Sequence, residues 1–382
     1  MQEKLQNLGK INPPSKLPSV IEYVDLESVK GTDLMNHENL ESVSAPSRAQ
    51  RLAQKGDIFY QTVRPYQKNN YYFDMDDNNF VFSTGYAQIR PTKIDGKFLF
   101  YKIQDDKFVT EVLKRSTGTS YPAINSHDLS KIDFLVPTNI PEQNWIGKLL
   151  IKLDKIITLE QEKTKKLESL KTYLVQNLFA YDKGYPFLRF QNFFSPWETR
   201  RLSEITSIIG GGTPSTKINE YWNGDINWFT PSEIRDNIYV EDSNRKISDL
   251  GLQKSSANIL PKDKTILFTS RAGIGNTAIL KEYSATNQGF QSLILDENTN
   301  VYFLFSMSET IKKEAIRRAS GSTFLEISAT ELGKITVSLP DIKEQEKIGN
   351  LLQSIDNSIN VNRDILKNYK QTKDILLRKL FI

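Results

Sequence analysis

The chain repeats one long segment of its own sequence, and this internal repeat constrains the fold more than any other feature. The stretch from Arg115 reads RSTGTSYPAINSHDLSKIDFLVP, and the stretch from Arg318 reads RASGSTFLEISATELGKITVSLP, at a shift of 203 residues (318 − 115). Further along, at a shift of 202 (344 − 142), Glu142-Gln143 aligns with Glu344-Gln345 and Leu178-Phe179 with Leu380-Phe381. A period near half the chain is too long for a solenoid. It indicates two copies of one module.

Each copy ends in a long amphipathic helix. Apolar residues recur three and four positions apart after Pro137 and again after Pro340, which is the spacing of one helix face. Asn139 with Glu142, and Asp341 with Glu344, form capping-box arrangements at the two starts. A helix over 142–179 would be about 57 Å long, against roughly 11–12 residues for an average helix. Because such a helix needs a partner along its apolar face, we expect the two copies to pack together as a coiled coil; two ordinary core helices in separate domains are the alternative.

The parts before these helices have mixed secondary structure. Aromatic and β-branched runs between turn formers predict strands at 57–60, 79–82, 98–101, 265–268 and 301–305. Short helices are predicted at 106–114 and 309–319, and Gly184 and Pro186 mark the boundary between the copies. The fold class is therefore α+β, a tandem duplication of a mixed α+β domain followed by a long helix. The expected ranges are 1–138 for the first domain, 139–181 for its helix, 182–340 for the second domain and 341–382 for its helix.

Composition excludes several classes of function. The 382 residues include no cysteine, which excludes disulfides and cysteine zinc sites and fits a reducing cytoplasm, where we place the protein. No apolar run reaches membrane-spanning length and the N-terminus has no signal-peptide pattern, so we expect no membrane association. The net charge of +4 favours an anionic partner only weakly. His37 and His127, the two histidines, have no metal-ligand spacing, and we expect no metal site.

Three local motifs resemble catalytic ones. The run Asn12-Pro13-Pro14-Ser15 resembles the Asn-Pro-Pro-aromatic loop of amino-methyltransferases, but Ser15 has no ring to stack a flipped base. The run 273–275, Gly-Ile-Gly, has no third glycine and is weak as a cofactor loop. It favours a plain turn, with a tight turn that presents its backbone to phosphate as the alternative. Pro340-Asp341 resembles a nuclease carboxylate motif, although Asp341 already serves as a helix cap. We therefore expect no catalytic residue and no cofactor bound by this chain.

Nucleic-acid contact has a better physical basis. The segments 115–120 and 317–323 each place arginine and small hydroxyls around a glycine just after a predicted helix, which suits phosphate oxygens. The alternative, compatible with the first, is that the glycine caps the helix. Other candidates lie in a Gly-Gly-Thr-Pro-Ser-Thr run at 211–216 or beside predicted strand ends, where each could equally be a solvated surface residue. The DNA-binding candidates are Arg64, Lys68, Arg90, Arg115, Ser116, Thr117, Thr119, Thr213, Ser215, Thr216, Lys217, Ser270, Arg271, Asn276, Arg317, Arg318, Ser320 and Ser322.

The duplicated organisation resembles the specificity subunit of type I restriction–modification systems. The resemblance is carried by the helix starts Pro-…-Glu-Gln-…-Ile-Gly-…-Leu-Leu-…-Asp at 137–154 and 340–356, by Trp197-Glu198-x-x-x-Leu202 and by Thr286-Asn287-Gln288-Gly289-Phe290. It covers nearly the whole chain. It implies two target-recognition domains held apart by two antiparallel helices, with each domain reading one half of a split DNA site. The first module departs from this pattern, since it has no counterpart of the Trp197 entry or of the Gly-Gly-Thr-Pro-Ser loop.

The resemblance also implies the partners. They are double-stranded DNA, two methyltransferase (modification) subunits docked on the helices, and restriction/translocase subunits. S-adenosylmethionine and ATP/Mg are then expected on those partner subunits, and the chain itself is a non-catalytic subunit. Two alternatives of different class are a protein-only coiled-coil adaptor and a self-contained DNA methyltransferase. Because the heads of the two modules resemble each other far less than the helices do, we expect the heads to do the same task on different targets.

Overall fold

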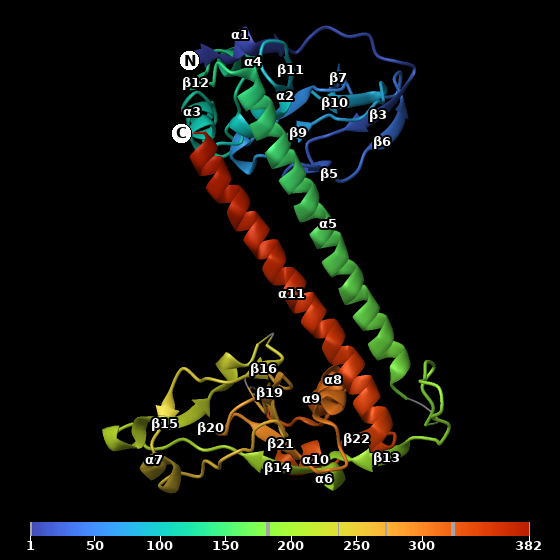
Figure 1. Ribbon diagram of the computed structural model, residues 1–382, viewed down its shortest axis with the longest axis vertical. Coiled ribbons are helices and arrows are strands. Elements are labelled where there is room, and N and C mark those ends of the chain that lie inside the picture. Colours follow the sequence, from blue (N-terminus) through green and yellow to red (C-terminus); the bar gives the residue numbers. More distant parts are fainter. Residues whose placement is uncertain (1, 181–183, 236, 272, 322–324, 382) are drawn as a thin grey trace. The chain divides into compact units, whose positions relative to one another are not determined.

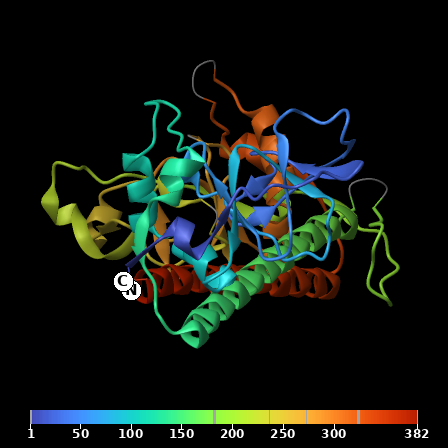
Figure 2. The same ribbon diagram turned by 90° about the horizontal axis from the view of Figure 1, so that it is seen from above.

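The computed structural model describes residues 2–180, 184–235, 237–271, 273–321 and 325–381 (Figure 1). The chain divides into two compact units, one made of residues 1–162 and 363–382 and the other of residues 163–362. Both divisions fall inside long helices of 39 residues, α5 (Ile140–Leu178) and α11 (Ile342–Leu380), seen in green and red in Figures 1 and 2. Each unit therefore holds one α+β head, here called the first head (2–139) or second head (184–341), and stretches of both helices.

The first head contains two four-stranded sheets with strand orders β6-β3-β10-β7 and β2-β11-β8-β9. In the first sheet β3 and β10 run parallel, with Tyr23 opposite Val81. A short antiparallel pair joins β1 to β12. The elements are β1 (Gln2–Lys4), α1 (Leu5–Leu8), β2 (Gly9–Ile11), β3 (Val20–Val24), β4 (Val29–Lys30), β5 (Asp33–Leu34), β6 (Glu38–Glu41), β7 (Ala49–Leu52), β8 (Ile58–Gln61), η1 (Pro65–Gln67), β9 (Tyr71–Tyr72), β10 (Phe80–Ser83), β11 (Tyr86–Pro91), α2 (Gly96–Lys102), α3 (Asp106–Lys114), α4 (Ser126–Ser130) and β12 (Asp133–Leu135).

The second head contains a five-stranded sheet, β14-β21-β18-β19-β16, and a three-stranded sheet, β17-β15-β20. Again one pair is parallel, β15 with β20, and Trp228 lies opposite Ala285. The elements are β13 (Glu198–Arg201), α6 (Leu202–Ile205), β14 (Thr206–Gly210), η2 (Asn219–Tyr221), β15 (Trp222–Phe229), η3 (Pro231–Glu233), β16 (Tyr239–Val240), β17 (Lys246–Ile247), α7 (Asp249–Gln253), β18 (Thr265–Phe268), β19 (Thr277–Leu280), β20 (Ser284–Thr286), β21 (Gln291–Leu295), α8 (Val301–Ser306), α9 (Ser308–Arg318), α10 (Ala329–Gly333) and β22 (Thr336–Leu339).

The two heads are built on one frame. The strand pair β1–β12 corresponds to β13–β22, and the parallel pair β3–β10 corresponds to β15–β20. The first head therefore has an entry strand in the place of β13, even though its sequence has no counterpart of Trp197. The sequence leaves open whether the first module has this strand, and the structure places β1 there, paired with β12.

Two of the predicted strands are helices. The segments 98–101 and 301–305 lie in α2 and α8, where Asp95 and Asn300 cap the helix starts by accepting hydrogen bonds from the amides of Phe98 and Phe303. Five of the seven residues of α2 and three of the six residues of α8 are buried and none is fully exposed, so the polar face that would reveal a helical period is absent. The strands predicted at 57–60, 79–82 and 265–268, and the helices predicted at 106–114 and 309–319, are confirmed within one residue.

The repeated helix motif attaches each long helix to a head. Gln143 accepts a hydrogen bond from the Asp95 amide (3.0 Å) and donates one to the Pro137 carbonyl (2.7 Å). Its counterpart Gln345 makes the same pair of bonds, to the Asn300 amide (3.0 Å) and the Pro340 carbonyl (2.9 Å). One turn on, a Cβ on Gly147 would lie 2.7 Å from the Phe98 amide nitrogen. The repeated Glu-Gln-…-Ile-Gly pattern is therefore explained by a polar bridge followed by a close backbone approach.

A tyrosine, an aspartate and a lysine join the two helices in each unit. Tyr101 donates to Asp154 (2.6 Å), and Lys373 of α11 binds the other oxygen of that carboxylate (2.6 Å). The second unit repeats this arrangement with Tyr302 (2.7 Å) and Lys171 (2.6 Å) on Asp356. Burial first, and then the adjacent carboxylate, raises the pKa of both tyrosines well above the usual range, so both remain hydrogen-bond donors.

The long helices run antiparallel. In the second unit Lys163 of α5 contacts Asn362 of α11 (3.0 Å), and eight residues on, Lys171 contacts Asp356. The capping expectation holds at Asp341, which accepts from the Glu344 amide (3.1 Å). The Glu344 side chain instead binds Arg189 through two bonds of 2.8 Å and does not complete the box.

Each long helix ends in the head of the other module. Phe381, at the end of α11, is 3% exposed and packs against Phe98 of the first head, at 5.3 Å between ring centroids. Phe179, at the end of α5, is 2% exposed and packs against Phe303 of the second head, at 5.1 Å. Within the described ranges, no helix has both the length and the apolar character needed to cross a membrane.

Candidate nucleic-acid interface

The first candidate loop follows β8 and carries Arg64. Arg64 and Lys68 flank the short helix η1, and both have left-handed backbones, with φ of 53° and 55°. Such conformations are uncommon for residues with a side chain and are kept only where the surroundings enforce them. Here the Arg64 amide donates to the Pro122 carbonyl (2.8 Å), and its guanidinium lies 4.3 Å from the ring centroid of Tyr121. The loop is therefore tied to the segment that follows Arg115.

That segment is closed by a short backbone pair in both heads, and we call it the hairpin. Thr117 and Ala123 exchange two backbone hydrogen bonds of 2.9 Å, and Ser320 and Glu326 exchange bonds of 3.0 and 2.9 Å. Gly118 turns the first hairpin with φ of 90°. Helix α3 ends at Lys114, with Arg115 as its cap residue, so the glycine closes the hairpin and the interpretation of it as a helix cap is wrong. Arg115, Thr117 and Thr119 are exposed on this hairpin, with Ser116 partly buried.

The structure brings the strand-end loop and the hairpin together by the same bonds in each head. The Thr62 backbone donates to the Gly85 carbonyl (2.9 Å) and accepts from the Ile124 amide (3.0 Å). In the second head, the Ser270 backbone donates to the Gly289 carbonyl (2.8 Å) and accepts from the Ile327 amide (3.0 Å). Arg271 directly follows Ser270, and Arg64 lies two residues after Thr62. Both arginines are partly exposed. These bonds place Gly85 and Gly289 at corresponding positions beside β8 and β18.

The Gly-Gly-Thr-Pro-Ser loop lies beside these segments in the second head. A Cβ on Gly211 would lie 2.1 Å from the Asn287 carbonyl oxygen, so the close approach requires glycine. Thr213 donates to the side chain of Gln288 (2.5 Å), two residues from Phe290 and next to Gly289. The loop exposes four of the candidate residues to solvent, namely Thr213, Ser215, Thr216 and Lys217.

The structure gives other candidates internal roles. Arg90 binds Asp57, which is buried, with two bonds of 2.8 and 2.7 Å, and this hydrogen bonding raises the pKa of the arginine. Two of its donor groups, Nε and Nη2, are therefore occupied by a buried carboxylate, although 26% of the side chain stays exposed. Ser270 is 0% exposed. We correct the expectation for Ser270, since its side chain is not available to a partner at the surface.

The remaining candidates have local partners or lie outside the described ranges. Lys68 binds Asp106 (2.5 Å) and lowers the pKa of that carboxyl, and Arg317 binds Glu314 (2.6 Å). Asn276 accepts from Lys312 (3.3 Å). Arg318 and Ser320 are exposed or partly exposed. Ser322 lies outside the described residues. The candidates that remain accessible to a phosphate are thus concentrated on the two hairpins, the strand-end loops and the 211–217 loop.

Sequence reasoning missed one exposed cation of this region. Arg245, just before β17, stacks on Trp222 with 3.7 Å from its Cζ to the ring centroid. The tryptophan pair at 222 and 228 is visible in the sequence, but its arginine partner lies outside the strand that carries the pair.

The catalytic motifs are used for packing. The Asn12 side chain accepts from the Gln88 amide (2.9 Å) and donates to Ser126 (2.8 Å), so both of its polar atoms are engaged within the fold. A Cβ on Gly275 would lie 2.4 Å from Lys312, as in a turn packed on a helix. His37 binds Glu22 (2.8 Å). Among the described residues there is no group of three or more histidine, aspartate and glutamate side chains that could hold a metal ion.

Comparison with known proteins shows the family. The model of the type I restriction modification DNA specificity domain matches the chain twice, over residues 28–169 and 195–370. The MjaIX specificity subunit of Methanocaldococcus jannaschii is 37% identical over 188 residues, covering 47% of this chain and 41% of that relative. The HindI specificity subunit of Haemophilus influenzae is 22% identical over 95% of this chain and 94% of its own. The first of these matches thus spans less than half of the relative.

A solved structure has the same fold along the whole chain. The S subunit of a type I restriction-modification system from M. genitalium aligns with a TM-score of 0.65 at 17% identity, covering all of this chain and 96% of that one. The two heads, the two antiparallel helices and the two matched domains agree with the duplication in the sequence. This chain belongs to the family of type I restriction modification DNA specificity domain proteins.

Proposed function

We propose that this chain is the DNA-recognition and scaffolding subunit of a type I restriction–modification complex, with each head reading one half of a split double-stranded DNA target. The observation that carries the proposal is the double match to a DNA specificity domain on a duplicated frame whose exposed loops differ. A shared frame with different loops is what two readers of different half-sites require. In each head, hydroxyls and an exposed arginine beside a closed backbone pair, Thr117–Ala123 or Ser320–Glu326, are suited to phosphate oxygens.

The contacts divide into two kinds. Arg115 and Arg318 occupy corresponding places at the hairpins, where they would position each head on the phosphate backbone. Arg64, Arg271 and the 211–217 loop differ between heads and would face base edges. Ser116, Thr117, Thr119 and Ser320 would complete the phosphate contacts.

The helices would carry the catalytic partners. Exposed apolar side chains remain on α5 and α11 outside the faces that pack within each unit, among them Leu159 (63%) and Ile375 (53%) in the first unit and Tyr173 (50%) and Val361 (57%) in the second. Such side chains mark protein interaction surfaces. We expect two methyltransferase subunits to dock there, with S-adenosylmethionine on those subunits and ATP/Mg on restriction/translocase subunits, all in the cytoplasm. The chain itself would perform no chemistry.

The test is a methylome of the host with and without the gene. The proposed function predicts one split motif that disappears with the gene. Exchanging residues 1–136 for the first head of another family member should change one half of the motif and leave the other unchanged. A protein-only adaptor would show no sequence-specific DNA affinity even with its partners present, and a self-contained methyltransferase would bind S-adenosylmethionine as an isolated chain. A change in both halves together would contradict the two-reader arrangement.

A further inference from the structure

Arg245 in the second head is an exposed arginine held against two buried indoles. Its Cζ lies 3.7 Å from the ring centroid of Trp222 and 5.7 Å from that of Trp228. The two indoles meet edge to face, with centroids 5.1 Å apart, and are 8% and 4% exposed. A guanidinium stacked on a ring loses freedom of rotation but keeps its N–H donors in its own plane, directed outward from the edge.

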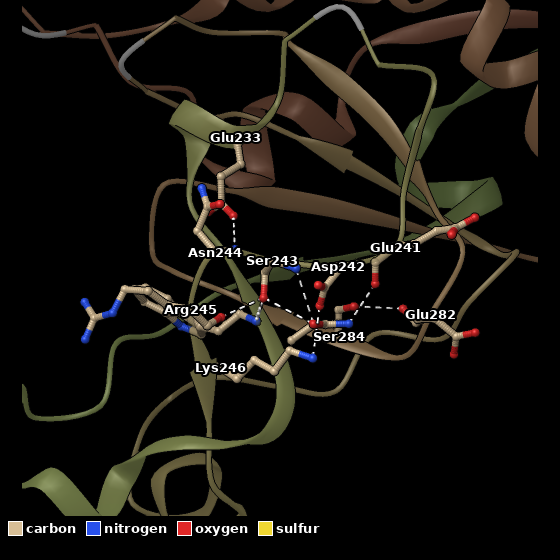
Figure 3. Close-up of polar contacts among 11 residues, drawn as sticks. Glu233, Glu241, Asp242, Ser243, Asn244, Arg245, Lys246, Glu282 and Ser284 are labelled. Atoms are coloured by element: carbon tan, nitrogen blue, oxygen red, sulfur yellow. Dashed lines mark hydrogen bonds and ion pairs between the residues drawn. The ribbon is translucent and has the colours of Figure 1, made fainter.

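The turn that carries Arg245 is held at nearly every residue (Figure 3). Ser243 donates from Oγ to the Arg245 carbonyl (2.6 Å) and accepts from the Trp228 amide (2.8 Å). The Asn244 amide donates to Glu233 (2.8 Å), and Asn227 donates to the Glu241 carbonyl (2.8 Å). Figure 3 shows the Arg245 guanidinium pointing away from these bonds. The backbone beneath the side chain is therefore rigid.

The donors of this guanidinium are free. Within the described part of the chain, no hydrogen bond or ion pair involves the Arg245 side chain, which contacts the two tryptophan rings. The nearby carboxylate of Asp242 is bound by Lys246 (3.0 Å), and that of Glu233 by Asn244 and Thr230. A planar set of donors that is oriented in advance and unoccupied is suited to bind a planar acceptor pair.

Arg245 lies beside loops already assigned to the interface. Trp222 donates from Nε1 to the Ser215 carbonyl (3.1 Å), and Trp228 donates to the Gly212 carbonyl (2.8 Å). The same two indoles thus support Arg245 and anchor the loop that exposes Thr213, Thr216 and Lys217. In the first head the matching place is taken by Glu38, since Tyr23 pairs with Glu38 as Trp228 pairs with Arg245. The charge at this place is reversed between the heads.

We propose that Arg245 determines specificity by reading a guanine in the half-site of the second head, donating two hydrogen bonds to O6 and N7 in the major groove. Arginine makes this bidentate contact with guanine more often than any other specific contact. The same fork can also bind two phosphate oxygens, and the motif and the salt dependence of the variant distinguish the two contacts. The inference rests on the proposed function, and it adds which base is read in the second half-site, guanine, and which residue reads it, Arg245.

The experiment uses the whole complex in its host, with the wild-type methylome defining both half-sequences. Arg245→Ala should relax one G·C position of the second half-site, lowering discrimination there by about 10- to 100-fold, and leave the first half unchanged. Arg245→Lys keeps the charge, so it should preserve the salt dependence of binding while losing part of the discrimination. Arg235→Ala is the matched control, because Arg235 is another exposed arginine of this head, bonded to the Ser232 carbonyl (3.2 Å).

Three results would overturn the inference. Uniformly weaker binding by Arg245→Ala, with an unchanged motif and a salt slope lower by about one, would assign the side chain to a phosphate. An unchanged motif with unchanged binding would show that the Arg245 side chain only shields the two tryptophan rings from solvent. A wild-type protein without any split motif would contradict the proposed function itself, and that outcome is separate from the first two. In the first two cases, retention of the first half-sequence shows that the variant is folded and assembled.

Discussion

The two heads differ most where they are exposed and least where they meet the helices. Both heads have a stacked arginine, but the first places Arg64 on Tyr121 after β8, and the second places Arg245 on Trp222 before β17. The bonds that join Thr62 and Ser270 to their neighbours, in contrast, agree within 0.1 Å or less, at 2.9 and 2.8 Å and at 3.0 and 3.0 Å. These backbone hydrogen bonds hold the same arrangement of strands and hairpin in both heads, because they do not depend on which side chains the loops carry. Loops on a constant frame can therefore change target without loss of fold.

Where the heads meet the long helices, in contrast, the side-chain contacts themselves are the same in both modules. Gln143 and Gln345 make the same pair of bonds, and each aspartate at the centre of its unit takes one tyrosine and one lysine. Each lysine comes from the helix of the other module. A change in these side chains therefore affects contacts with a helix from the other module as well as contacts within its own.

The largest effect is expected where each helix ends. Phe179→Ala should lower the free energy of unfolding by about 3 to 5 kcal/mol, because it removes a buried ring that contacts both Trp197 and Phe303. Phe381→Ala should cost less, since among the described residues its ring packs against one aromatic ring, that of Phe98. Urea unfolding measures both, with the exposed Leu170→Ala as control. Equal losses would show that the ends of the two helices are held alike.

A smaller loss is expected from the central carboxylates. Asp356→Ala leaves Tyr302 and Lys171 without their acceptor and should destabilise by about 2 to 3 kcal/mol, less than a fully buried pair because the lysine is partly exposed. Asp154→Ala should give a similar value. The Asp356→Asn variant keeps an acceptor for the tyrosine and should lose less, as measured by urea unfolding. A large difference between the losses of unfolding free energy for the two aspartates would show that the two head–helix junctions are not equivalent.

The smallest effect is expected in DNA affinity. Arg115→Ala and Arg318→Ala should each weaken binding to all sequences and reduce the salt slope by about one, with the motif unchanged. Titrations of the assembled complex at several salt concentrations measure this, and Lys114→Ala is a nearby control, since Lys114 is paired with Glu111 (2.6 Å). A relaxed motif with the wild-type salt slope would place either arginine on a base edge instead.

The architecture is predictable because a duplication identifies its own helices. The repeat aligns the two long helices, and their apolar spacing predicts their length from the sequence alone. The segments at 98–101 and 301–305 resemble strands because burial on nearly all sides removes the helical period. Their caps, Asp95 and Asn300, are the signal that distinguishes them from strands.

The site is only partly predictable, because its partners are remote in sequence. Arg90 is expected at the surface, yet its partner Asp57 is 33 residues away on another part of the sheet. Arg245 escapes sequence reasoning because nothing near it in sequence shows that it stacks on Trp222. The hairpin arginines are easier to find, since their exposure follows from the turn that contains them.

The position of Phe381 has a consequence for synthesis of the chain. The core of the first head includes this ring, which lies at the end of α11 and is made after the second head. The apolar site for the ring must therefore stay open while the second head is synthesised. The second head, by contrast, receives Phe179 from a helix that is made before it, so its core can close as it emerges. A first head that waits for α11 is exposed to chaperones and proteases for longer.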